Sequence, residues 1–162
     1  MFVMVGAILV YSIAFRLIMR RAKPVLAKFE AGTPILAGAV GLGAALDYVG
    51  QVGLPIIERH ESALMTRALE GLATLKRVRV IGQPRHRAGA ISFVIDGIDV
   101  TTVGALLDQE GIAVRAGHHC AQPTLAHFGL KASVRPSFAL YNNATDVDAL
   151  IAALDRIIHK TP

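Results

Sequence analysis

The pattern of apolar positions divides the chain into an N-terminal apolar segment and a longer region of short, regular elements. Residues 1–19 are nearly all apolar, and a basic cluster follows at residues 20–28. A membrane span needs about 20 apolar residues, so this run lies at the lower limit for an inserted helix. A buried helix and a displaced reading frame are the alternatives. If the segment inserts, the positive-inside rule keeps the rest of the chain in the cytoplasm.

Apolar residues at helical spacing predict a series of helices after this segment. The first should begin behind Gly32, with Thr33 as its N-cap and Pro34 at its first position. The last is amphipathic, and we expect Thr145 to cap it. The predicted helices span residues 34–48, 55–75, 99–110, 123–128 and 146–159.

Short runs of strand-forming residues separate the later helices. Residues 90–95 are apolar almost throughout, which is typical of a strand covered on both faces. Strands that alternate with helices around a small sheet predict an α+β domain with helices packed on the sheet. The predicted strands span residues 78–81, 90–95, 112–115 and 134–140.

Composition narrows the functional classes. The chain has 162 residues, of which 53% are hydrophobic and 18% charged, as in an ordinary packed domain. Its net charge is +5, but the basic residues cluster near the start or lie scattered. Without a nucleic-acid recognition motif, we do not expect nucleic acid as a partner. The chain has a single cysteine, which excludes an internal disulfide.

The segment Ala113–Pro123 carries the most informative group of reactive side chains. It reads AVRAGHHCAQP, and we expect a strand that ends at Arg115 and a loop that presents Cys120. Cysteine reacts as its thiolate, which nearby positive charge favours. Arg115, His118 and His119 would supply such charge. The alternative is a buried Cys120 that serves only as a small apolar residue.

A metal site at this segment is the weaker interpretation. His118, His119 and Cys120 are consecutive, so their side chains diverge, whereas structural zinc ligands are usually spaced by two or more residues. His127 is nearby, but a set of four ligands would be hard to assemble. We therefore predict no metal.

Two further residues are ambiguous from the sequence alone. Thr33 precedes a helix, so it either belongs to an anion site at the helix N-terminus or is an ordinary cap. Arg135 lies in an otherwise apolar strand, and its planar guanidinium suits a carboxylate. That carboxylate could belong to a ligand or to an acidic residue of the chain.

Four sequence stretches point to a known family when they are taken together. They are FEAGTP (29–34), GLGAALDYV (41–49), RAGHHCAQP (115–123) and VRPSFALYN (134–142). In this order and spacing they resemble the SUF-type, group II cysteine desulfurases of the class V aminotransferase family. The resemblance covers residues 23–162, whereas residues 1–22 are unlike the family. It implies the small C-terminal domain of a fold-type I pyridoxal-phosphate enzyme, with a short, mostly antiparallel sheet.

The resemblance also implies a role for each candidate residue. Cys120 is similar to the nucleophile that takes sulfur from L-cysteine as a persulfide and leaves alanine. Arg135 matches the arginine that binds the substrate carboxylate. Thr33 resembles the threonine that reaches a cofactor phosphate of the partner subunit in a homodimer. Arg115 and His119 are expected to shape the cysteine loop.

The family places pyridoxal phosphate mainly on a large N-terminal domain, and nothing in this sequence corresponds to its Schiff-base lysine. Lys76, Lys131 and Lys160 lie in other contexts. We therefore expect a chain that is inactive alone, although the resemblance implies iron–sulfur cluster assembly through a SUF sulfur-acceptor protein. The alternative is a membrane-tethered, non-catalytic module that binds a desulfurase or a sulfur acceptor.

Overall fold

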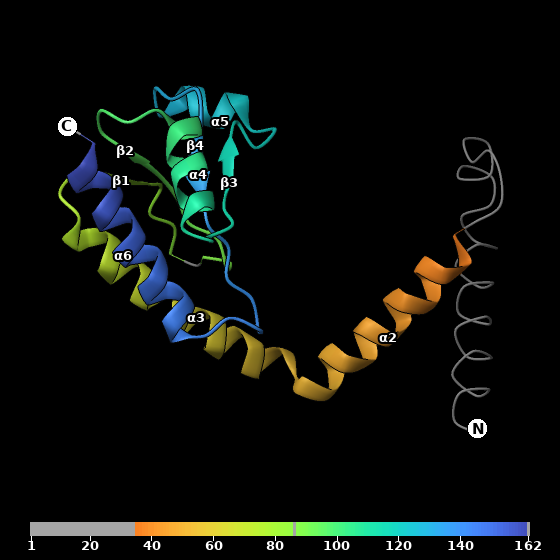
Figure 1. The fold of residues 1–162 in the computed structure, drawn as a ribbon. Helices are drawn as coiled ribbons and strands as arrows, with labels where there is room; N and C mark the ends of the chain where they lie inside the picture. Colours follow the sequence, from red (N-terminus) through yellow and green to blue (C-terminus); the bar gives the residue numbers. More distant parts are fainter. Residues whose placement is uncertain (1–34, 86, 162) are drawn as a thin grey trace, which may run out of the picture. The chain divides into compact units, whose positions relative to one another are not determined.

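A computed structural model describes residues 35–85 and 87–161 of the chain (Figure 1). The chain divides into two compact units, Met1–Leu54 and Pro55–Pro162. The predicted apolar segment at residues 1–22, including the possible membrane span at 1–19, lies outside the described residues, as do Thr33 and Pro34.

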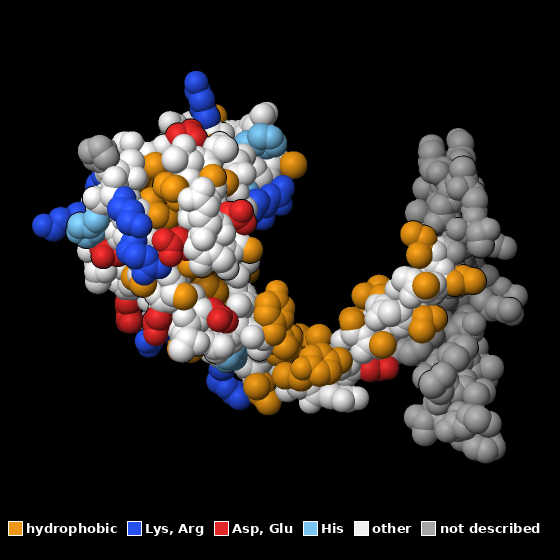
Figure 2. Space-filling view, in the orientation of Figure 1, with side chains coloured by type: hydrophobic (Ala, Val, Ile, Leu, Met, Phe, Trp, Pro, Cys, Tyr) orange, Lys and Arg blue, Asp and Glu red, His pale blue; other side chains and the backbone are white. Residues whose placement is uncertain are grey.

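The described part of the first unit is helix α2, Leu36–Val52. It ends at Gly53, whose backbone adopts φ 89° and whose N–H donates to the carbonyl of Val49 at 2.9 Å. The helix is confirmed, but it begins at Leu36 with Ile35 as its N-cap, so the predicted start at Pro34 with a Thr33 cap is wrong, and it continues past the predicted end at Tyr48. Figure 2 shows hydrophobic side chains along it. Large exposed side chains of this stretch are Ile35, Leu36, Val40, Leu42, Leu46 and Tyr48.

Within the described ranges, no single helix is both long and apolar enough to cross a membrane. Helices α2 and α3 (Leu54–Thr74) meet that length and composition test only when taken together as a bent pair.

The second unit contains a four-stranded antiparallel sheet in the order β1-β2-β4-β3. The short central strand β2 pairs Phe93 with Val134 of β4 and is buried along three of its four residues. This confirms the predicted α+β fold with a small antiparallel sheet and the covered strand. The strands are β1 (Val78–Ile81), β2 (Ser92–Ile95), β3 (Arg115–Gly117) and β4 (Ser133–Arg135).

Helices pack on the sheet and enclose one hydrophobic core. Helices α3 and α6 run side by side, and α4 contacts strands β2, β3 and β4 (Figure 1). The core combines residues from helices and strands, which is why neither would be stable alone. The remaining helices are α4 (Val100–Gln109), α5 (Gln122–His127) and α6 (Ala144–Lys160). The largest fully buried side chains are Phe93, Leu72, Ile91, Leu107, Leu150 and Leu154.

The cap of α6 differs from the prediction. Asn143, not Thr145, is the N-cap, and its side chain accepts from the N–H groups of Thr145 and Asp146. Asp146 in turn accepts from the Asn143 N–H at 2.9 Å. This reciprocal pair is a capping box, so the preference for Thr145 was wrong by two positions.

The third strand also differs from the prediction. The predicted strand 112–115 is wrong, because β3 begins at Arg115 and continues to Gly117. Ile112 and Val114 are partly buried against the core instead, so their apolar character reflects packing and not sheet pairing. Strand β4 is likewise shorter than the predicted 134–140. The chain beyond it still touches the sheet through a bridge between Ala90 and Ser137.

Candidate active site

Cys120 lies in the short segment that joins β3 to α5, and it is exposed. The interpretation of Cys120 as a buried apolar residue is therefore wrong. His119 and Cys120 both have φ 55°, in the left-handed region. That region is unfavourable for residues with a Cβ, at about 1–2 kcal/mol per residue. Local contacts must therefore hold this turn in place.

Two histidines supply those contacts. The Cys120 N–H donates to Nδ1 of His118 at 3.0 Å. Nε2 of His119 lies 2.9 Å from the carbonyl oxygen of Ser133 and 3.1 Å from its hydroxyl oxygen. Because a carbonyl only accepts, the hydrogen of His119 is on Nε2. The neighbour of Cys120 is thus tied to strand β4.

The environment of His119 favours its neutral form. Burial is the main cause that lowers the pKa of His119. The hydrogen bond to the Ser133 carbonyl opposes this change, and the positive charges of Arg135, Arg115 and His118 add to it. With its hydrogen on Nε2, the neutral ring has an unprotonated Nδ1, which is buried and without a hydrogen-bond partner among the described residues.

Arg135 has unsatisfied hydrogen-bonding capacity. Its Nε is buried and has no partner in the described part of the chain. The antiparallel register places Arg115 of β3 directly opposite Arg135 of β4. Like charges opposite each other destabilise a sheet unless an anion compensates them. The predicted alternative of a structural acid paired with Arg135 finds no support among the described ion pairs.

A cavity of ≈ 290 Å³ lies beside this strand. Arg87, His119 and Arg135 line it, and among the described residues neither an acidic residue nor a lysine contributes to its lining. Arg87 donates to the Gly82 carbonyl at 2.8 Å, so it is partly engaged already. Cys120 is adjacent in sequence to lining residues but does not line the cavity itself. The charge of the lining suits a small anion such as a carboxylate.

The structure therefore places four predicted site residues on the β3–β4 pair and on the loop that follows β3. Arg115, His119, Cys120 and Arg135 all belong to these strands or to the loop between β3 and α5. Thr33 lies outside the described residues, so its predicted role stays a prediction. Across the described ranges, no group of three His, Cys, Asp or Glu side chains could hold a metal ion.

Sequence reasoning missed Ser133. Among the described residues it is the only buried polar side chain, and it is fully inaccessible to solvent. Buried polar groups are normally hydrogen-bonded, so such a residue in a strand marks a specific contact. Its sequence signal was weak, because Ser133 directly precedes the apolar residue from which the strand was predicted to begin.

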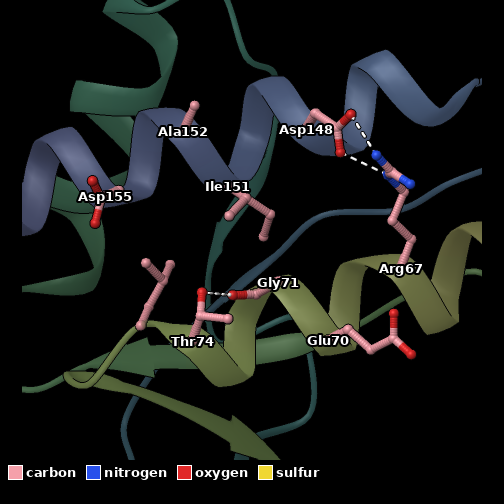
Figure 3. Close-up of a pocket in the computed structure, with 9 residues that line it drawn as sticks. Arg67, Glu70, Gly71, Thr74, Asp148, Ile151, Ala152 and Asp155 are labelled. Atoms are coloured by element: carbon pink, nitrogen blue, oxygen red, sulfur yellow. Dashed lines mark hydrogen bonds and ion pairs between the residues drawn. The ribbon is translucent and has the colours of Figure 1, made fainter.

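A larger groove of ≈ 600 Å³ lies between α3 and α6 (Figure 3). Arg67 and Asp148 face each other there and form a two-pronged ion pair, with N···O distances of 2.6 and 2.8 Å. Both side chains are about half exposed. Among the described residues, no cysteine or histidine lines this groove, so it lacks the side chains on which the predicted chemistry depends.

Comparison with known proteins assigns the chain to a family. Residues 12–150 match the model of the aminotransferase class-V family. The match begins within the apolar segment that we expected to differ from the family, so the boundary at residue 22 stays a prediction.

Two curated relatives are a cysteine desulfurase of Synechococcus elongatus and a probable cysteine desulfurase of Halalkalibacterium halodurans. The first is 48% identical over 135 residues, 83% of this chain and 22% of the relative. The second is 49% identical over 129 residues, 80% of this chain and 32% of the relative. The chain thus spans a third or less of the length of these relatives.

Solved structures give the same assignment. A cysteine desulfurase from Thermococcus onnurineus has a TM-score of 0.76 at 40% identity, with 82% of this chain and 33% of that chain covered. The cysteine desulfurase CsdA from Escherichia coli has a TM-score of 0.76 at 38% identity, with 83% and 33% covered. The chain belongs to the class-V aminotransferase family, among its cysteine desulfurase homologues.

Proposed function

We propose that this chain is the nucleophile-bearing, C-terminal part of a SUF-type cysteine desulfurase. The reaction converts L-cysteine to L-alanine and leaves a persulfide on Cys120, which a sulfur-acceptor protein collects for iron–sulfur cluster assembly in the cytoplasm. One observation carries the proposal most directly. An exposed thiol follows the strand that pairs with Arg135, whose guanidinium lines an anion-suited cavity.

Each residue of this site has a separate task in the proposal. Arg135 binds the substrate carboxylate, because its planar guanidinium can donate two parallel hydrogen bonds. Cys120 accepts the sulfur atom as its thiolate, the reactive form of cysteine. Its position on an exposed turn lets the persulfide reach an acceptor protein. Arg115 and His119 keep this turn beside the Arg135 strand.

The described residues do not fit pyridoxal phosphate, the cofactor of this family. The cofactor supplies the carbon chemistry when it is bound, through a Schiff base with a lysine. In the part of the chain that the structure describes, the cavity beside Arg135 has no lysine and no carboxylate in its lining. Thr33, the proposed phosphate contact across a homodimer, lies outside the described residues. We therefore propose that the chain alone does not convert L-cysteine to L-alanine.

The inactivity of the isolated chain can be tested directly. Purified protein mixed with pyridoxal phosphate and L-cysteine should develop no internal-aldimine absorbance and release no alanine. A full-length relative, such as the Synechococcus elongatus enzyme, is the positive control. Alanine release by the isolated chain above the rate of free cofactor would contradict this part of the proposal.

A chimera tests the roles of the residues. Residues 23–162 should replace the homologous segment of the Synechococcus elongatus enzyme, to which the chain is 48% identical. We expect an active chimera, because nearly half of the aligned positions are identical. The Cys120→Ser variant should lose at least about a hundredfold in alanine release, since the nucleophile is removed.

Arg135 has a matched control in the same chimera. Arg135→Lys keeps the charge but loses the two-pronged geometry, so KM for L-cysteine should rise by about tenfold or more. Arg79→Lys on β1 is exposed and lies outside the cavity lining, so its KM should equal that of the parent chimera. An unchanged KM in Arg135→Lys would refute the carboxylate role.

A second candidate function is a non-catalytic module that binds a desulfurase or its sulfur acceptor. The exposed apolar side chains of α2 favour it, because large apolar patches mark interaction surfaces. Pull-downs with a full-length desulfurase and with a sulfur-acceptor protein test it, with the Leu42→Glu/Leu46→Glu double variant as the control. Binding of either partner that the double variant abolishes supports the module, and binding of neither removes it. Its membrane tether at residues 1–19 is tested by fractionation.

A further inference from the structure

Ser133 links the cysteine loop to the arginine strand. It is fully buried, and its carbonyl and hydroxyl oxygens lie 2.9 and 3.1 Å from Nε2 of His119. Strand β4 runs from Ser133 to Arg135, so the contact point of the loop is two residues from the guanidinium. His119 directly precedes Cys120. Ser133 and His119 together thus connect the thiol segment to the Arg135 strand.

The backbone of the loop needs such a connection. His119 and Cys120 both adopt φ 55°, a conformation that residues with a Cβ leave unless neighbouring contacts hold them. Strand pairing ends at Gly117, which is opposite Ser133. Beyond that pair, the link to β4 is made by the His119 side chain, which contacts the same residue, Ser133. Rotation of either residue to negative φ would redirect the Cys120 side chain.

We propose that Ser133 and His119 form a clamp that positions the Cys120 thiol with respect to Arg135. This proposal rests on the proposed function, in which the thiol and the guanidinium act on one substrate. Ser133 and His119 are positioning residues in this scheme, because neither needs to touch the substrate. The Ser133 hydroxyl and carbonyl fix the hydrogen of His119 on Nε2, and the ring then fixes the turn.

Alkylation of Cys120 measures this position in the intact chain. Cys120 is the only cysteine in the sequence, so every alkylation event reports on it. The rate ratio of anionic iodoacetate to neutral iodoacetamide reports the positive charge near the thiol. Releasing the clamp in His119→Leu should lower this ratio by about twofold at low ionic strength, the size expected when one unit charge roughly 10 Å away in water moves off.

Conservative variants separate positioning from simple stability. His119→Gln keeps an N–H donor for Ser133 and should restore most of the ratio, as should Ser133→Thr, which keeps the hydroxyl. Ser133→Ala removes only one of the two contacts and should give an intermediate ratio. His127→Leu is the matched control, because His127 is exposed on α5 and should leave the ratio unchanged. Thermal unfolding by circular dichroism identifies variants that are merely less stable.

The outcomes are distinct. A wild-type ratio in folded His119→Leu, or a ratio that His119→Gln fails to restore, overturns the clamp. If His119→Leu does not fold, an unchanged ratio in Ser133→Ala overturns it instead. These measurements need neither cofactor nor L-cysteine. If the chimera is inactive but the alkylation ratios follow the clamp, only the proposed function is refuted. If the chimera is active and His119→Leu leaves its kcat unchanged, only the clamp is refuted.

Discussion

Helices α2 and α6 have the same length but differ in how many of their side chains are buried. Each has 17 residues, yet α6 buries five side chains, whereas the only buried residue of α2 is Gly43. The apolar residues of α6 recur at helical spacing, so one face of the helix packs on the core and the opposite, charged face is solvated. Helix α2 is apolar nearly all round, with Asp47 as its only charged residue.

This difference shows what apolar content alone fails to indicate. A helix that is apolar on all sides normally lies in a core or another apolar environment. In the described structure α2 has large exposed side chains, whereas α6 completes the core of the second unit. A helical repeat of apolar positions predicts that one face of the helix packs within the chain. A helix that is apolar on all sides indicates a surface that is stable only in contact with another apolar surface. Substitutions in the two helices should therefore have different effects.

The largest expected difference comes from matched leucines. Leu154 of α6 is fully buried, whereas Leu46 of α2 is 60% exposed. Leu154→Ala should lower the free energy of unfolding by about 2–5 kcal/mol, because it leaves a cavity. Leu46→Ala should change it by less than about 0.5 kcal/mol. Urea denaturation followed by circular dichroism measures both, and equal losses would contradict the comparison.

The cap of α6 gives a smaller effect. Asn143→Ala removes the acceptor for two backbone N–H groups and should cost about 1 kcal/mol. Thr145→Ala is the control, since Thr145 donates its hydroxyl to the Asn143 side chain but caps no backbone group. It should cost clearly less than Asn143→Ala in the same denaturation experiment. The reverse order would restore Thr145 as the cap.

A glycine in α2 gives a smaller comparison. A Cβ at Gly41 would meet nothing within 4 Å, so Gly41→Ala should stabilise α2 by about 0.5–1 kcal/mol through helix propensity. Helical circular dichroism on heating measures the gain. Gly71→Ala in α3 is the contrast, because its Cβ would lie 2.6 Å from Ile151 and should destabilise the second unit. A loss in Gly41→Ala would reveal a contact that covers α2.

The smallest effect concerns the ion pair that links α3 to α6. The hydrogen bond from Arg67 holds the pKa of Asp148 below its ordinary value of 3.8. A lowered pKa stabilises the fold above the unfolded value, and this contribution is lost as the pH falls through the folded value. Asp148→Asn should therefore destabilise slightly at neutral pH and not at all in strong acid. In an Arg67→Gln background, Asp148→Asn should show no such pH dependence.

Helices and the sheet class were predictable because their signals are local. The second helix was predicted as residues 55–75 and spans Leu54–Thr74, since its apolar positions recur at helical spacing. The capping box at Asn143 was also readable, because Asp146 follows three residues later. The start of β3 was not, because Arg115–Gly117 becomes a strand only through pairing with β4, which is distant in sequence.

The candidate site was predictable only in part, for a related reason. Cys120, Arg115 and His119 all lie within residues 115–120, so a sequence motif identifies them. Their spatial relation to Arg135 depends on the β3–β4 register, and the role of Ser133 depends on burial. The positive φ angles at His119 and Cys120 carry no glycine signal, so the strained turn emerges only from the folded chain.

The most direct test of the account is the chemical state of Cys120 in the active chimera. After L-cysteine is added and unbound thiols are removed, mass spectrometry of the peptide that contains residue 120 should show the mass of one additional sulfur atom, which a reductant removes. Omitting L-cysteine or using D-cysteine should leave the peptide unmodified. A chimera that releases alanine while Cys120 stays unmodified, or that keeps its rate in Cys120→Ser, would contradict the account.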